Sequence, residues 1–192
     1  MNEPQGLGLC HAYNENIGHL SMSDVRALFP GTYPLCNWLT KDIDIERGDV
    51  PTCWDIAHTK LLARAVGFGQ SYPNSWFKVQ NEPDSHDQAT LDPKHFVDLM
   101  MNWGVLGIGY AIAPNVSIVF ESGQKWLMSM IEGGGLQYID ALGIHIHGLQ
   151  NGDRFVEFWE WFKANIYFPF CDGLGVHITE FSPIEASTPN ER

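Results

Sequence analysis

Strand-like and helix-like segments alternate along residues 50–181, and this alternation limits the possible folds more than any other feature of the sequence. Apolar side chains recur at helical spacing between the strand-like runs, and Phe96, Leu99, Met100 and Trp103 give a clear example. Each strand and its following helix occupy about 30 residues, the size of a βα unit with its crossover. Short apolar runs predict strands at 77–80, 116–120, 140–148 and 174–181. This alternation predicts an α/β fold with a parallel sheet, either open or closed into a barrel.

Capping residues indicate where the predicted helices begin and end. Thr52 is expected to cap a helix that Gly67 ends, and Asp92 is expected to cap another that begins at Pro93. The first 50 residues are less regular: a strand is expected within 6–13, and the proline- and glycine-containing stretch 30–51 is expected to be a long loop.

The composition favours a folded, acidic protein. The chain has 192 residues, of which 44% are hydrophobic and 18% charged, so we expect one domain over residues 1–192. The net charge of −12 argues against binding to nucleic acid or to an anionic membrane. No run of about 18 apolar residues predicts a membrane span, and no signal peptide is recognised. Four widely spaced cysteines, without a C-x-x-C pair, argue against a zinc ribbon.

Two glutamates stand at the ends of predicted strands. Glu82 follows the strand at 77–80, and Glu180 lies near the end of the strand at 174–181. In a parallel barrel all strands point the same way, so both carboxylates are expected at the mouth where such barrels hold their active sites. Two facing carboxylates form the acid/base and nucleophile pair of glycoside hydrolysis. Mutual repulsion is expected to keep one protonated while the other is ionised.

The motifs around these glutamates resemble a known group of enzymes. Asn81-Glu82-Pro83 and Ile178-Thr179-Glu180-Phe181, together with ARAVGFGQSYP and IDALGIHIHG, resemble the clan A glycoside hydrolases over residues 50–183. That resemblance implies a (β/α)8 TIM-barrel type of fold and a retaining mechanism. Because a full barrel needs about 250 residues and only 12 follow Glu180, we expect an incomplete or reduced barrel, with roughly strands three to seven recognisable.

The same resemblance assigns roles to individual residues. It implies that Glu82 is the acid/base, that Glu180 is the nucleophile, and that Asn81 binds the sugar 2-hydroxyl. His145 would line the site. His147 stands where the clan usually has a tyrosine that touches the nucleophile, and its imidazole N–H could replace that hydroxyl, with consequences for the pH profile.

These observations lead to a first hypothesis with two alternatives. We expect a retaining glycoside hydrolase that acts on a β-linked polysaccharide or oligosaccharide of the glucan or xylan type, without metal or cofactor, in an extracellular location. Trp76 and Trp126 are expected to stack on sugar rings. One alternative is a non-catalytic carbohydrate-binding relative or an inactive fragment of such an enzyme. The other is a metal-dependent barrel hydrolase that uses His145 and His147, with His177 or Glu121 as a further ligand.

Overall fold

The described residues form one sheet of seven parallel strands, whose order in space follows their order in the sequence. The computed structural model describes residues 9–10, 35–38, 50–88, 90–149 and 152–182. Successive strands pair with each other in parallel register from the first to the last. The strands are β1 (Leu9–Cys10), β2 (Leu35–Trp38), β3 (Val50–Cys53), β4 (Trp76–Val79), β5 (Tyr110–Ser117), β6 (Ala141–His147) and β7 (Gly175–Ser182).

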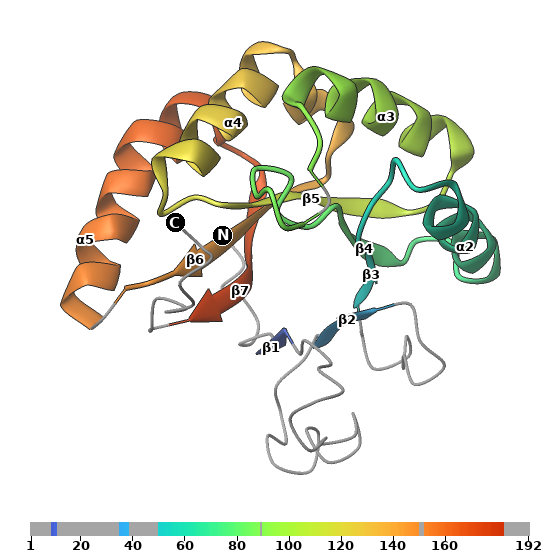
Figure 1. The fold of residues 1–192 in the computed structure, drawn as a ribbon, viewed down its shortest axis with the longest axis horizontal. Helices are drawn as coiled ribbons and strands as arrows, with labels where there is room; N and C mark the ends of the chain where they lie inside the picture. Colours follow the sequence, from blue (N-terminus) through green and yellow to red (C-terminus); the bar gives the residue numbers. More distant parts are fainter. Residues whose placement is uncertain (1–8, 11–34, 39–49, 89, 150–151, 183–192) are drawn as a thin grey trace, which may run out of the picture.

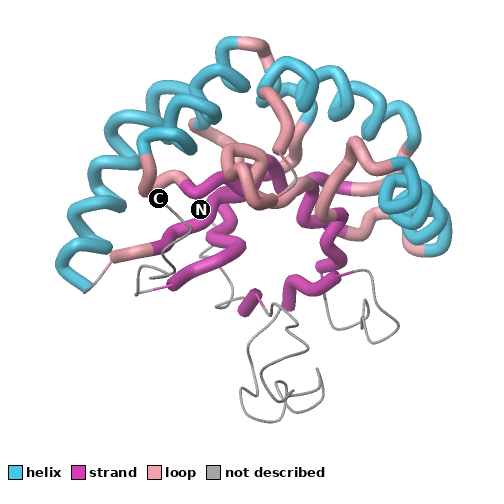
Figure 2. Tube along the Cα trace, in the orientation of Figure 1, coloured by secondary structure: helices cyan, strands magenta, loops and turns pink. Residues whose placement is uncertain are grey.

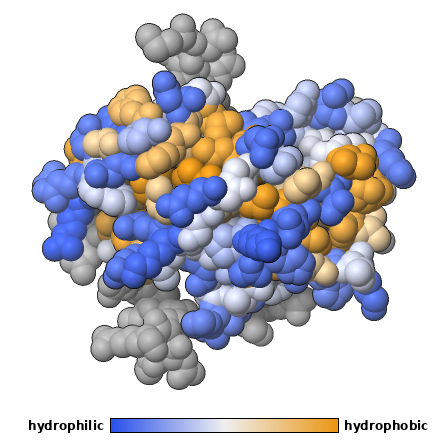
Figure 3. Space-filling model, turned by 90° about the horizontal axis from the view of Figure 1, so that it is seen from above, coloured by the Kyte–Doolittle hydropathy of each residue, from blue (hydrophilic) through white to orange (hydrophobic). Residues whose placement is uncertain are grey.

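Helices cover the outer face of this curved sheet. They are α2 (Thr59–Ser71), α3 (Pro93–Leu106), α4 (Glu121–Glu132) and α5 (Gly152–Phe162), and a π-helical segment (Lys163–Cys171) continues α5. The four helices follow one another in an arc around the strands (Figures 1 and 2). The face seen in Figure 3 mixes hydrophilic and hydrophobic residues. Among the described residues, we find no helix with the length and apolar character needed to cross a bilayer.

The sheet curves so that its first strand, β1, lies beside its last strand, β7. The main core lies between the sheet and the helices. Phe77 of β4 is fully buried there, and its ring meets those of Phe68 on α2 and Trp103 on α3 edge-on. The prediction of an α/β fold with a parallel sheet is therefore confirmed.

Three elements predicted from the sequence have wrong boundaries. Thr52 lies in β3 and caps no helix: α2 begins at Thr59 and continues past Gly67 to Ser71. The loop expected over 30–51 contains β2 and the start of β3.

The third error concerns β5, which begins at Tyr110 and ends at Ser117 instead of covering 116–120. Pro114 lies inside this strand, where a proline argues against a central strand. The strand expected within 6–13 is described only at Leu9–Cys10, and its other residues lie outside the described part.

Asn115, in β5, connects three strands through its buried side chain. Its Nδ2 lies 2.8 Å from the carbonyl oxygen of Val79 and 3.0 Å from that of Gln80, at the end of β4. Its Oδ1 accepts a 2.7 Å hydrogen bond from the Thr179 hydroxyl of β7. Gly143 of β6 leaves the space for this amide, because a Cβ there would lie 2.2 Å from Asn115 Oδ1.

We therefore expect Gly143→Ala to lower the free energy of unfolding by about 1–3 kcal/mol, the usual cost of overfilling a packed interior. Equilibrium unfolding in urea measures this change. Gly104→Ala in α3 is the matched control, because nothing lies within 4 Å of a Cβ built there. It is expected to be neutral or stabilising, since alanine favours a helix over glycine. Equal stability of the two variants would contradict the packing argument.

Candidate active site

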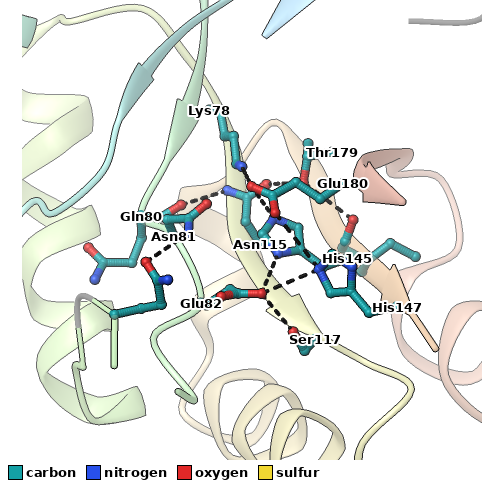
Figure 4. A network of polar contacts seen from close by, with 12 residues as sticks. Lys78, Gln80, Asn81, Glu82, Asn115, Ser117, His145, His147, Thr179 and Glu180 are labelled. Carbon is teal, nitrogen blue, oxygen red and sulfur yellow. Dashed lines mark hydrogen bonds and ion pairs between the residues drawn. The ribbon is translucent and has the colours of Figure 1, made fainter. Parts of the chain in front are cut away.

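Charged and polar side chains from four neighbouring strands meet at the carboxyl end of the sheet (Figure 4). Glu82 follows β4, and Ser117 ends β5. His145 and His147 come from the end of β6, and Glu180 comes from β7. The two glutamates and two histidines each offer one oxygen or nitrogen atom, and these atoms all lie within 4.8 Å of one another. The structure thus brings together the two glutamates and the two histidines singled out in the sequence.

Glu82 is held by three groups at a single oxygen. Its Oε1 lies 3.0 Å from Ser117 Oγ, 3.1 Å from His145 Nδ1 and 3.4 Å from His147 Nε2. The backbone at Glu82 has a positive φ of 43°, a conformation that non-glycine residues rarely adopt and that is concentrated at functional sites. Its N–H donates to the carbonyl of Asn115 at 3.1 Å, which fixes this turn to β5.

These contacts determine the protonation of Glu82. Burial raises the pKa of its carboxyl group, but hydrogen bonds from His145, His147 and Ser117 outweigh burial, and the pKa falls well below its usual range. The expectation that repulsion keeps one glutamate protonated is not met at Glu82 in this arrangement.

Glu180 is paired with a buried ammonium group. Lys78 Nζ lies 2.6 Å from Glu180 Oε1, and His145 Nε2 lies 3.6 Å from the same oxygen. The other oxygen, Oε2, lies 3.8 Å from His147 Nε2. The Lys78 side chain is 2% exposed and that of Glu180 is 27% exposed, so the carboxylate joins a buried cation to the open side of the site.

His145 is fully buried between the two carboxylates. Burial lowers its pKa, so the ring is neutral at neutral pH despite its hydrogen bond to Glu82. A neutral ring that donates from Nδ1 to Glu82 carries its lone pair on Nε2. Within the described part of the chain, that nitrogen has no hydrogen-bond partner.

Asn81 directly precedes Glu82 and, like His145, has a buried acceptor atom without a hydrogen-bond partner among the described residues. Its side chain is 5% exposed, and its Nδ2 approaches Gln88 Oε1 at 3.5 Å. No described residue donates to its Oδ1. A buried acceptor without a partner is costly, so this atom is suited to a hydroxyl group of a ligand.

The two tryptophans that were expected to stack on sugar rings lie away from the two glutamates, so that prediction is wrong. Trp126 is 8% exposed in the core, where its ring packs on Phe96 and its N–H donates to the carbonyl of Leu91. Trp76 is 38% exposed but begins β4, at the opposite end of the strand from Glu82, and its ring lies against Tyr110.

His177 and Glu121, the further metal ligands considered from the sequence, do not belong to the cluster of two glutamates and two histidines. His177 lies in the first half of β7, with its ring centroid 5.8 Å from that of Trp76. Glu121 is exposed on α4 and pairs with Lys125 at 2.6 Å. Any ion at this site would instead be held by the two histidines together with Glu82 and Glu180.

Four site residues were missed in the sequence: Lys78, Asp84, Asn115 and Ser117. Strand alternation was a usable signal for Lys78, because Phe77 and Val79 face the helices and the residue between them must face the other way. Asp84 accepts a 3.4 Å hydrogen bond from the backbone of Ser117, and burial raises the pKa of its carboxyl group.

Three solved structures share the fold of this chain at 16–24% sequence identity. An endo-β-1,3-glucanase of GH128 subgroup I from Amycolatopsis mediterranei, in complex with laminaritriose, is 19% identical with a TM-score of 0.71, over 98% of this chain and 76% of that one. A curdlan-specific exo-β-1,3-glucanase of subgroup III from Blastomyces gilchristii, in complex with glucose, is 24% identical with a TM-score of 0.65, over 92% and 74%. A subgroup II endo-β-1,3-glucanase from Pseudomonas viridiflava is 16% identical with a TM-score of 0.57, over 92% and 70%.

A family model settles the class of protein. No curated protein matches the chain. The model described as "Glycosyl hydrolase catalytic core" matches residues 35–192, which include every side chain of the cluster described above. The prediction of a glycoside hydrolase is thereby confirmed: the chain belongs to the glycosyl hydrolase catalytic core family.

Proposed function

We propose that this glycoside hydrolase cleaves β-1,3-glucan with retention of configuration, with Glu82 as acid/base and Glu180 as nucleophile. The approach of the two carboxylates carries the proposal: one oxygen of each lies within 4.8 Å of the other. Retaining enzymes hold their carboxyl groups about 5–5.5 Å apart, whereas inverting enzymes leave about 6.5–9.5 Å for a water molecule.

The fold and the structural relatives support the substrate. The three neighbours described above are named as β-1,3-glucanases, and another structure of the first holds laminarihexaose. A neutral glucan also suits a chain of net charge −12. Within this proposal the seven strands form the wall of a (β/α)8 TIM-barrel type of catalytic domain that includes residues 1–192, in keeping with the clan A resemblance.

In the first step, Glu180 attacks the anomeric carbon as the bond to the leaving glucan oxygen breaks, and Glu82 gives that oxygen a proton. In the second step, Glu82 takes a proton from water, the water oxygen bonds to the anomeric carbon, and Glu180 leaves as a carboxylate. Asn81 is placed to bind a sugar hydroxyl through its unpaired Oδ1.

Glu82 must carry a proton at the start of the first step and be ionised at the start of the second. The hydrogen bonds on Oε1 favour the ionised form, which is ready to act as base in the second step. For the first step Glu82 must take up a proton. Of the three groups at Oε1, the side chain of His147 is 23% exposed while His145 and Ser117 are buried, so we assign the proton path to His147.

We expect Glu180→Ala to abolish hydrolysis of laminari-oligosaccharides. Glu82→Ala is expected to lose at least about 100-fold on the same substrates, the lower end of what general acid–base catalysis contributes. It should recover partly on a 2,4-dinitrophenyl β-laminaribioside, whose leaving group needs no proton. Glu121→Ala, an exposed glutamate on α4, is the control and should retain full activity. Equal activity of the two site variants on both substrates would refute the assignment of roles.

The low pKa of Glu82 has a consequence for stability. A carboxylate whose pKa is lowered in the folded state stabilises the protein when the pH is above the pKa of the unfolded chain, which is near 4.5 for a glutamate. This stabilisation is lost progressively as the pH falls below 4.5. Urea unfolding should therefore show wild-type stability falling more steeply between pH 5 and pH 3 than that of Glu82→Gln, which cannot ionise. Parallel slopes would show that the hydrogen bonds do not favour the ionised form.

A metal-dependent hydrolase is the second candidate, because the two glutamates and two histidines could hold a divalent ion. The ammonium group of Lys78, 2.6 Å from Glu180, opposes a cation there. We expect dialysis against EDTA to leave laminarin hydrolysis unchanged. Loss of activity that zinc restores would favour the metal candidate. Binding of laminarihexaose by isothermal titration calorimetry, without turnover, would instead indicate a carbohydrate-binding relative.

A further inference from the structure

Lys78 is a buried charged residue, among those the structure describes, that the mechanism above does not use. It lies in the middle of β4, between Phe77 and Val79, which are both fully buried against the helices. Strand alternation sends the lysine to the other face of the sheet, where it is 2% exposed. A lysine is almost never buried to this extent without a partner, because an uncompensated buried charge is strongly destabilising.

Its ion-pair partner is the proposed nucleophile, 102 residues away in the sequence. The 2.6 Å contact between Lys78 Nζ and Glu180 Oε1 joins β4 to β7 directly (Figure 4). The two strands do not pair with one another, because β5 and β6 lie between them in the sheet. The side chain therefore reaches across the inner face of the curved sheet.

The contact makes the two oxygens of Glu180 unequal. Oε1 faces Lys78 and His145, which are both buried, at 2.6 and 3.6 Å. Oε2 has the longer contact of 3.8 Å to His147, whose side chain is 23% exposed. Oε1 therefore lies against two buried groups, whereas the nearest of these groups to Oε2 is the partly exposed His147.

We propose that Lys78 is a positioning residue that anchors Oε1 of Glu180, so that Oε2 is the oxygen that bonds to the sugar. This inference rests on the proposed function. In the first step a lone pair of Oε2 forms the bond to the anomeric carbon while the leaving oxygen departs with its bonding electrons and a proton from Glu82. Oε1 then becomes the carbonyl oxygen of the ester and stays within reach of the ammonium group.

The charge of Lys78 acts more strongly on the second step. When water replaces the enzyme at the anomeric carbon, the electrons of the ester bond return to Glu180 and restore its negative charge. A buried ammonium group 2.6 Å away stabilises that charge and has less to stabilise in the neutral ester. Lys78 therefore favours release of the sugar over persistence of the covalent intermediate.

Lys78→Met, a substitution of similar length, tests this inference with a 2,4-dinitrophenyl β-laminaribioside, for which the first step is fast. We expect kcat to fall about 10- to 100-fold, the range for loss of a hydrogen bond to a charged group, and KM to fall with it. Intact-mass spectrometry of rapidly quenched samples should show a larger fraction of glycosylated enzyme than in wild type. Lys125→Met, which removes an exposed lysine of α4, is the control and should match wild type.

Two further variants keep the test decisive if Lys78→Met does not fold. Lys78→Gln removes the charge and should accumulate the intermediate, whereas Lys78→Arg keeps the charge and should accumulate less. Unchanged kinetics, or a lower kcat without a lower KM and without accumulation, would overturn the role of Lys78. Absence of hydrolysis and of glycosylated Glu180 in the wild type would instead refute the proposed function itself.

Discussion

The buried amide of Asn115 is the interaction on which the rest of the site depends. It contacts the carbonyl oxygens at the end of β4 and accepts a hydrogen bond from Thr179, the neighbour of Glu180. The carbonyl of the same residue accepts the N–H of Glu82. One residue of β5 therefore positions the backbone next to both carboxylates. Gly143 is the complementary feature, since any larger residue would meet the amide oxygen.

The two carboxylates sit in different chemical surroundings although they lie so close together. Glu82 receives hydrogen bonds from neutral or weakly basic groups and has a route to solvent through His147. Glu180 faces the buried ammonium group of Lys78 at 2.6 Å. The contact with the partly exposed His147 suits a group that must exchange protons, whereas the ammonium group of Lys78 suits a carboxylate whose negative charge must be restored when the sugar leaves. This asymmetry supports the assignment of acid/base and nucleophile.

Much of the fold and of the site could be predicted from the sequence, because strand alternation and chain direction are local signals. They placed Glu82 and Glu180 at the same end of a parallel sheet. The errors arose where tertiary packing overrides local pattern: Pro114 is accommodated inside β5, and Thr52 extends a strand instead of capping a helix. Strand alternation indicates which face Lys78 occupies, but nothing local indicates that its partner is a carboxylate 102 residues away.

We propose that Glu82 and Glu180 act as a retaining pair on β-1,3-glucan. The most direct test is proton NMR of the anomeric signals during the first minutes of laminarihexaose hydrolysis, before the products mutarotate. With a retaining pair, the β-anomer of the new reducing end appears first and the α-anomer follows by mutarotation. If the α-anomer appears first, the reaction inverts the anomeric centre, and the proposed roles of Glu180 and Lys78 are wrong.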